Sequence, residues 1–216
     1  MTELLLIRHG QANADATDEA SYDRLSDLGR QQAIWLGEWL QTTGMTFDRL
    51  VHGSLSRQRD TAALAFQRDA EVDARWDEIS YFILSTMYAE HHGHVAPDVP
   101  EDVSDYFAGL MAAWSVDALP NAPERYADFK GRVLAALDDQ AALGGNAAII
   151  TSGGVIGMAV AVALDLGPEG MARLGVAVEN TSIHRLTWRG GRWRLLEFGA
   201  SPHLASADRI HARTYV

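Results

Sequence analysis

Short apolar segments recur along the chain, and each one stops at a turn signal. Residues 4–7, 47–53 and 147–151 are the clearest of these segments. Residues 71–75 are predicted to form a further strand, the third in chain order. Apolar runs of this length between turn signals are typical of strands that are buried on both faces. Two further segments, 176–186 and 192–198, flank Gly190 and Gly191, a pattern that predicts a hairpin.

Stretches with helical spacing separate the predicted strands. In residues 26–44, Ser26 is a good N-cap and Asp27 suits the positive end of the helix dipole, while Gly44 suits the C-terminal stop. A second long helix is predicted over residues 123–144, where Pro123 takes a first-turn position. Shorter helices are predicted after the second strand, after residue 152 and after Pro168. The polar residues 12–24 are predicted to form a loop.

Residues 80–122 are the least regular part of the chain. They contain an apolar cluster, prolines at 97 and 100, and an amphipathic stretch from 102 to 114. His91, His92 and His94 also lie close together here. Closely spaced histidines in a Gly/Pro loop could bind zinc, but no fourth ligand is evident nearby. A solvated loop is the interpretation that we favour, and we predict no metal.

The composition limits the functional classes. The chain has 216 residues, no cysteine and a net charge of −11. Its length suits one α/β domain with an insertion or two small domains, and without a repeat or linker we predict one domain over residues 1–216. The acidity disfavours nucleic acid and anionic membranes as partners, although a phosphate site needs only local arginines. The absence of cysteine, of a long apolar run and of a leader before the first strand predicts a cytoplasmic protein.

Arg8, His9 and Gly10 follow the first apolar run directly. In open α/β sheets, ligands bind at the carboxyl ends of the strands. Arg8 and His9 are therefore predicted to lie at the mouth of a site, where Gly10 lets the backbone turn and a ligand approach closely. The helix after the second strand would direct its first amide N–H groups at the same site, where they could bind an anion.

The segment Leu-Ile-Arg-His-Gly-Gln at residues 6–11 resembles the signature of the histidine phosphatase superfamily, which includes the phosphoglycerate mutases. Residues 25–33, 54–62 and 202–204 are similar to further segments of that family, so the resemblance covers nearly the whole chain. It implies a three-layer α/β/α sandwich with a mostly parallel central sheet. It also implies that residues 80–122, roughly, are a variable helical insertion that roofs the site and helps to choose the substrate.

The resemblance also implies roles for individual residues. His9 matches the nucleophile that becomes phosphorylated, Arg57 matches a second phosphate clamp beside Arg8, and Glu78 matches the proton donor. No metal or other cofactor is then required, because the arginines supply the electrostatic stabilisation. Gln11 is a candidate for further hydrogen bonds to the phosphate, and Asn13 is a weaker one.

Two of these positions have a competing neighbour of the same charge. Arg59 competes with Arg57, and Asp77 competes with Glu78. We favour Arg57 and Glu78 because they match the family pattern, and we interpret Arg59 as part of a solvated helix face.

Ser152 departs from the family, in which this position holds a second catalytic histidine. Three outcomes are open. The Ser152 hydroxyl and the helix-start amides of Gly153 and Gly154 could bind the phosphoryl group. Another histidine, such as His52 or His184, could occupy the space. Alternatively, the protein could have stopped catalysing and could bind a phosphorylated ligand only.

We therefore predict a metal-independent phosphatase that hydrolyses a phosphate monoester through phosphohistidine at His9. Arg8, Arg57, Gln11, Ser152 and Gly153 are the predicted phosphate-binding residues, and His9 and Glu78 are the predicted catalytic residues. The predicted partner is a small phosphorylated molecule or phosphate, and a homodimer is left open. The alternative is a degenerate family member that binds a phosphorylated ligand without efficient turnover.

Overall fold

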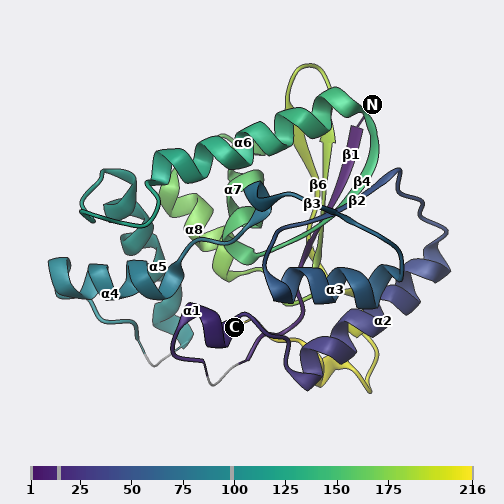
Figure 1. Cartoon of the computed structure of the whole chain (residues 1–216), viewed down its shortest axis with the longest axis horizontal. Helices are drawn as coiled ribbons and strands as arrows, with labels where there is room; N and C mark the ends of the chain where they lie inside the picture. Colours follow the sequence, from purple (N-terminus) through teal and green to yellow (C-terminus); the bar gives the residue numbers. More distant parts are fainter. Residues whose placement is uncertain (1, 14–15, 98–99, 216) are drawn as a thin grey trace.

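One mixed β-sheet forms the centre of the molecule. In the computed structural model, which describes residues 2–13, 16–97 and 100–215, the sheet has the strand order β3-β2-β4-β1-β5-β6 (Figure 1). The strands are β1 (Thr2–Arg8), β2 (Arg49–His52), β3 (Glu71–Val72), β4 (Gly145–Thr151), β5 (Ile183–Trp188) and β6 (Trp193–Ala200). The pairs among β1 to β4 are parallel, whereas β5 and β6 run antiparallel. The predicted mostly parallel sheet and the C-terminal hairpin are confirmed.

Helices cover both faces of the sheet and confirm the three-layer arrangement. In the described residues they are α1 (Glu19–Tyr22), α2 (Asp27–Thr43), α3 (Ser56–Phe66), α4 (Tyr81–His92), α5 (Pro100–Ser115), α6 (Tyr126–Leu143), α7 (Gly153–Ala163) and α8 (Pro168–Val176). Helices α2 and α3 pack on one face, and α6 and α7 pack on the other (Figure 1). No helix in the described part of the chain is both long enough and apolar enough to cross a membrane.

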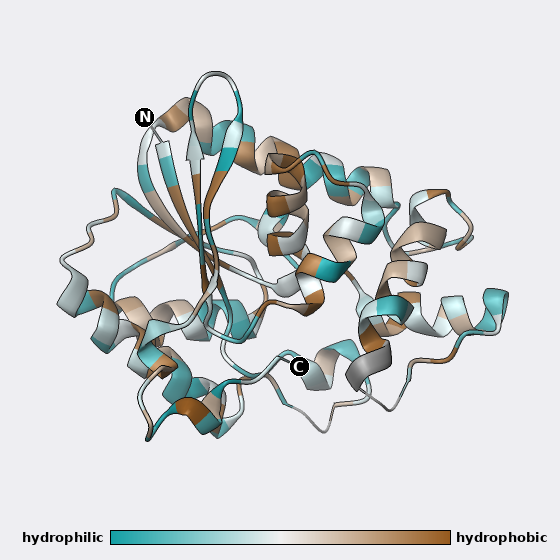
Figure 2. Cartoon of the chain, turned by 180° about the vertical axis from the view of Figure 1, so that it is seen from behind, coloured by the Kyte–Doolittle hydropathy of each residue, from teal (hydrophilic) through white to brown (hydrophobic). Residues whose placement is uncertain are grey.

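Strand β1 contributes to both cores because successive side chains of a strand point to opposite faces. Leu4 and Leu6 belong to the core on the α6–α7 side, and Leu5 and Ile7 belong to the core on the α2–α3 side. All four are almost completely buried. In Figure 2 the brown, hydrophobic colour accordingly runs along the strands in the middle of the molecule. This double burial explains why residues 4–7 form a continuous apolar run.

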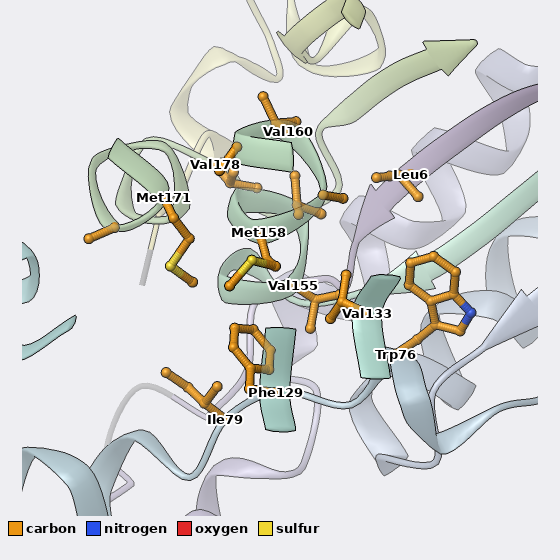
Figure 3. Close-up of a cluster of buried hydrophobic side chains, with 14 of the residues drawn as sticks. Leu6, Trp76, Ile79, Phe129, Val133, Val155, Met158, Val160, Met171 and Val178 are labelled. Atoms are coloured by element: carbon orange, nitrogen blue, oxygen red, sulfur yellow. The ribbon is translucent and has the colours of Figure 1, made fainter. Parts of the chain in front are cut away.

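Side chains of α6 and α7 pack together in the core on the α6–α7 side and hold α7 in place. Phe129 and Val133 of α6 are fully buried, as are Val155 and Met158 of α7, and Figure 3 shows the four side chains together. Removing a side chain of this size from water contributes roughly 1.5–3 kcal/mol. The first turn of α7, which begins at Gly153, is thereby held against the edge of the sheet.

The predicted caps of α2 and the predicted end of α6 are confirmed, whereas α6 begins at Tyr126 with Arg125 as its N-cap, not at Pro123. The Ser26 hydroxyl accepts a hydrogen bond from the backbone N–H of Gly29 at 3.0 Å and caps α2. Gly44, with φ of 68°, ends the same helix, and Gly144, with φ of 71°, ends α6. Both glycines have the left-handed φ that other residues adopt at a cost.

Three predicted strands are shorter than expected, and the segment 47–53 is strand only at Arg49–His52. The segment 71–75 forms a strand only at Glu71–Val72, which lies at the edge of the sheet and pairs with β2 alone. Asp73 then accepts from the backbone N–H of Arg75, and a turn of 3₁₀ helix buries Trp76 completely. The segment 176–186 is strand only from Ile183, because residues 179–182 form a turn in which Thr181 has a positive φ of 58°.

The irregular segment 80–122 contains α4 and α5, and α5 packs on α8 and α4. The ring of Tyr88 lies 5.2 Å from the ring of His92 and 5.2 Å from that of His94, centre to centre, and His91 is exposed. No group of three metal-ligating side chains occurs among the described residues.

Candidate active site

The predicted site residues come from strand ends on one edge of the sheet. Strand β1 ends at Arg8 and β4 ends at Thr151, and these two residues are partners in the parallel register. His9 and Ser152 follow them directly. Arg57 lies in the first turn of α3, the helix that follows β2. The carboxyl ends of β1, β2 and β4 therefore bring together residues that are far apart in the sequence.

His9 is held in one orientation and one tautomer. Its ring Nδ1 lies 2.7 Å from the carbonyl oxygen of Gly10, and its Nε2 accepts a hydrogen bond from Arg57 Nε at 3.2 Å. Because a carbonyl can only accept, Nδ1 carries the proton and Nε2 carries the lone pair. The side-chain amide of Asn180 donates to the carbonyl oxygen of His9 at 3.2 Å. The imidazole is buried and presents its lone pair to the arginine.

The surroundings of His9 keep the imidazole neutral. Burial, followed by the charges of Arg57 and Arg8, holds the pKa of His9 well below its usual value of 6.5. The hydrogen bond to the Gly10 carbonyl has the opposite, smaller effect. A neutral imidazole with an unprotonated Nε2 is the form that can act as a nucleophile.

The two arginines are buried and differ in what holds them. Arg57 pairs with Asp23 at 3.2 Å, and its guanidinium lies 4.9 Å from the centre of the Tyr22 ring. Arg8 donates from Nη1 to the carbonyl oxygen of Val178. Its Nε is buried and has no hydrogen-bond partner among the described residues. A buried donor without a partner is costly, so this N–H is a candidate contact for an anion.

Glu78 lies at the start of α7. Its two carboxylate oxygens accept from the backbone N–H groups of Ile79 and Gly154, each at 3.0 Å. Its charge also acts on Arg8. Asp77, the competing carboxylate, accepts instead from the backbone N–H and the hydroxyl of Ser54. Glu78 thus lies against the first turn of α7 and acts electrostatically on Arg8, whereas Asp77 is bound to Ser54.

The structure gives Ser152 and Gln11 contacts that sequence reasoning did not foresee. Ser152 is completely buried, and its hydroxyl accepts from Gln58 Nε2 at 2.9 Å. The side-chain oxygen of Gln11 accepts from the hydroxyl of Ser26 at 2.8 Å, which links the loop to the start of α2. Gly153 is buried, and a Cβ built on it would lie 3.8 Å from Arg8 Nε. Of these three predicted phosphate ligands, Gly153 is the one that the structure places against the unpartnered arginine nitrogen.

The backbone around Gly10 and at the start of α3 is packed against the protein itself. Gly10 lies against helix α2, because a Cβ on it would lie 2.3 Å from the carbonyl oxygen of Gly29. The first amides of α3, those of Ser56 and Arg57, donate to the carboxylate of Asp23. The helix start that was expected to face a phosphate thus binds a carboxylate of the protein itself.

Sequence reasoning missed several site residues, first among them Tyr22 and Asp23. They lie at the end of the segment predicted as a polar loop, which instead contains α1. Tyr22 lies 6.5 Å from the His9 ring, centre to centre, and Asp23 orients Arg57. Thr61, also missed, accepts from the backbone N–H of Gly10 at 3.0 Å. No spacing rule in the sequence marks these contacts, because each depends on a loop folding back onto a distant helix.

The remaining candidates lie outside the His9–Arg57 arrangement. Arg59 is exposed and pairs with Asp60. His52 directs its Nδ1 at the carbonyl oxygen of Gly53. Both ring nitrogens of His184 are occupied, one by the Ser182 hydroxyl and one by the backbone N–H of Gly199. His184 therefore does not stand in for a second catalytic imidazole.

Buried histidines are expected to make the protein sensitive to acid. Burial lowers the pKa of His184 to about 3 and that of His203 to about 4, and it lowers the pKa of His9 as well. The unfolded chain binds these protons near pH 6.5, whereas the folded protein does not, so the free energy of unfolding falls as the pH falls below 6.5. Each histidine contributes at most about 1.4 kcal/mol per pH unit.

Thermal unfolding followed between pH 7 and pH 5 measures this effect. We expect the melting temperature to fall steadily over that range and His184→Gln to make the decline shallower. The matched control is His91→Gln, which changes an exposed histidine and should leave the decline as it is. A melting temperature that stays constant from pH 7 to pH 5 would contradict the prediction.

Comparison with known proteins identifies the family of this chain. The family model of the histidine phosphatase superfamily (branch 1) matches residues 4–201. The chain belongs to this superfamily. A segment of 59 residues is 42% identical to the mitochondrial serine/threonine-protein phosphatase PGAM5 of Rattus norvegicus and covers 27% of this chain. The match spans only 20% of that relative's length.

Solved structures share the fold over nearly the whole chain at low identity. A phosphoglycerate mutase from Bacillus anthracis has a TM-score of 0.68 and 19% identity, with 94% of each chain covered. A phosphoserine phosphatase from Entamoeba histolytica, bound to phosphoserine, has a TM-score of 0.66 and 20% identity, covering 94% of this chain and all of that one. A mycobacterial glucosyl-3-phosphoglycerate phosphatase, bound to inorganic phosphate, has a TM-score of 0.65 and 22% identity, covering 94% and 99%.

Proposed function

We propose that this member of the histidine phosphatase superfamily hydrolyses a small phosphate monoester through a phosphohistidine at His9. The observation that carries the proposal is the state of the His9 ring. Its Nδ1 proton is directed at the Gly10 carbonyl, and its Nε2 lone pair faces Arg57. A nucleophile with a fixed tautomer next to two buried guanidinium groups is suited to attack on an anionic phosphoryl group.

In the proposed first step, Arg8 and Arg57 bind the non-bridging oxygens of the phosphoryl group. The unpartnered Nε of Arg8 supplies one contact, and Arg57 turns its Nε from His9 to the phosphate. The P–Nε2 bond then forms as the P–O bond to the leaving group breaks. The positive charge that develops on the imidazole is shared with Nδ1–H, whose hydrogen bond to the Gly10 carbonyl supports it.

Glu78 is the proposed proton carrier. In its protonated form it gives a proton to the departing oxygen, and as a carboxylate it then takes one from the water that attacks the phosphohistidine. The P–Nε2 bond breaks in this second step and inorganic phosphate leaves. The position of Glu78 at the start of α7 and its electrostatic interaction with Arg8 support this role for Glu78. None of these steps needs a metal ion or another cofactor.

A second candidate function is binding of a phosphorylated ligand without turnover. Ser152 favours it, because this buried hydroxyl is engaged by Gln58 and replaces the second imidazole of the family. Loss of one stabilising donor at a reacting phosphoryl group typically costs about a hundred- to a thousandfold in rate.

Hydrolysis of phenyl phosphate in the presence of EDTA distinguishes the two candidates. We expect the wild type to release phosphate at a rate that added Mg²⁺ does not change. The second assay uses Ser152→His, which restores the imidazole of the family. A wild type without turnover, together with an active Ser152→His variant, would contradict the catalytic proposal for the natural chain and favour the binding-only function.

A further inference from the structure

A strip of aromatic side chains leads from His9 to the helical insertion. We define the aromatic strip as Tyr22, Phe82, Tyr81 and Phe107. The Tyr22 ring lies edge-on to the imidazole of His9, and the Phe82 ring lies 5.8 Å from the Tyr22 ring. Tyr81 is 5.8 Å from Phe82, and Phe107 is 5.7 Å from Tyr81, each measured between ring centres. The strip therefore begins at the proposed nucleophile and ends on α5.

The first two rings of the aromatic strip are not used by the protein core. Tyr81 and Phe107 pack against the core on the α6–α7 side. Tyr22 and Phe82 are half-buried, and among the described residues they belong to neither core cluster. Tyr22 contacts the His9 ring and Phe82 contacts the Tyr22 ring, so these two rings are aromatic surface beside the proposed nucleophile that the core clusters do not use.

Contacts with the arginine and with α1 hold these two rings in place. The Tyr22 ring lies under the Arg57 guanidinium, 4.9 Å away. The backbone N–H of Phe82 donates to the carboxylate of Glu19 at 2.9 Å, which fastens α4 to α1. Rigid aromatic surface contacts a planar apolar group at little entropic cost.

The charges beside the strip oppose a second anionic group on the substrate. Glu19 is half-buried, and its carboxylate interacts electrostatically with Arg57 and with Glu78. Arginines around the insertion are paired with carboxylates, as in Arg173 with Asp105 and Arg132 with Glu124. A carboxylate or second phosphate on the leaving group would thus meet a negative charge beside the aromatic strip.

We propose that the site takes aryl phosphates, monoesters of phenols that carry no second anionic group beside the ester. This inference rests on the proposed function. The phenol ring lies against Tyr22 and Phe82 while the P–O bond breaks and the P–Nε2 bond to His9 forms. A phenol oxygen has a pKa of about 10, against about 15.7 for water, so a phenolate departs with less help from a proton donor. That property suits a site in which Ser152 stands in place of an imidazole.

The test compares kcat/KM for phenyl phosphate, cyclohexylmethyl phosphate and 3-phosphoglycerate. We expect phenyl phosphate to exceed each of the others by at least about a hundredfold. Phe82→Ala should lower kcat/KM for phenyl phosphate about tenfold. Ile83→Ala, which changes the adjacent and exposed side chain on α4, is the matched control and should leave it unchanged. In Glu19→Gln, the ratio of kcat/KM for phenyl phosphate to kcat/KM for 3-phosphoglycerate should fall about tenfold.

Two results would overturn the inference while leaving the proposed function intact. One is a wild type that hydrolyses 3-phosphoglycerate as well as phenyl phosphate. The other is a Phe82→Ala variant that behaves like Ile83→Ala. If no ester is hydrolysed, the proposed function fails, and calorimetry with two non-hydrolysable phosphonates then decides the inference. Tighter binding of phenylphosphonate than of phosphonoacetate supports it, and equal or weaker binding overturns it.

Discussion

Replacing His9 by alanine is expected to lower the turnover of phenyl phosphate by about a thousandfold or more. The variant removes the only protein atom that we propose to bond to phosphorus, and the arginines alone cannot form a covalent intermediate. Binding of inorganic phosphate should change far less, because Arg8 and Arg57 remain. Steady-state kinetics and calorimetry on the same protein preparations measure both quantities.

His52→Ala is the matched control for this prediction. His52 is the last residue of β2, much as His9 directly follows β1. Like His9, it is buried and directs its Nδ1 at the carbonyl oxygen of the following glycine. It lacks the Arg57 contact and is expected to keep turnover within a few-fold of the wild type. Comparable losses in the two variants would mean that damage to the strand end, rather than loss of the nucleophile, explains the His9 result.

Arg57→Ala is expected to weaken phosphate binding and to lower kcat/KM by about a hundred- to a thousandfold. The buried guanidinium touches the nucleophile and is held by Asp23, so its removal takes away both a phosphate clamp and a group that orients His9. Arg57→Lys keeps the charge but not the planar fork, and it should recover only part of the loss. Titration calorimetry with inorganic phosphate and steady-state kinetics measure the two effects.

Arg59→Ala provides the control on the same helix. Arg59 is exposed and pairs with Asp60, so its loss should change neither phosphate binding nor turnover. Melting temperatures of all variants show whether each one is folded. Equal phosphate binding by the wild type and Arg57→Ala would show that the anion site lies elsewhere.

Much of this arrangement could be predicted from the sequence because local rules decide it. The apolar run 4–7 is buried on both faces, so its end had to emerge at the edge of the sheet, and Arg8 and His9 lie there. Ser26 and Gly44 mark the ends of α2 because N-caps and left-handed C-caps are chemical requirements of a helix. The positions of Arg57 and Glu78 followed from the family resemblance.

The contacts that complete the site could not be predicted in the same way. Asp23 reaches the start of α3, which lies 34 residues away, and Tyr22 reaches His9 only because α1 folds back over the strand end. Gln11 turns to Ser26 instead of the site because a nearby helix cap offers it a hydroxyl. Such choices depend on tertiary packing, and no periodicity or spacing in the chain encodes them.

The most direct test of the central claim is to trap the covalent intermediate. Wild-type protein and the His9→Ala variant are mixed with phenyl phosphate carrying ³²P and quenched within milliseconds. We predict that the wild type holds a protein-bound label that is lost in acid and stable in base, as a phosphoramidate is, and that His9→Ala holds none. A label of equal amount in both proteins, or turnover by the wild type with no trapped label at any time, would contradict phosphohistidine formation at His9.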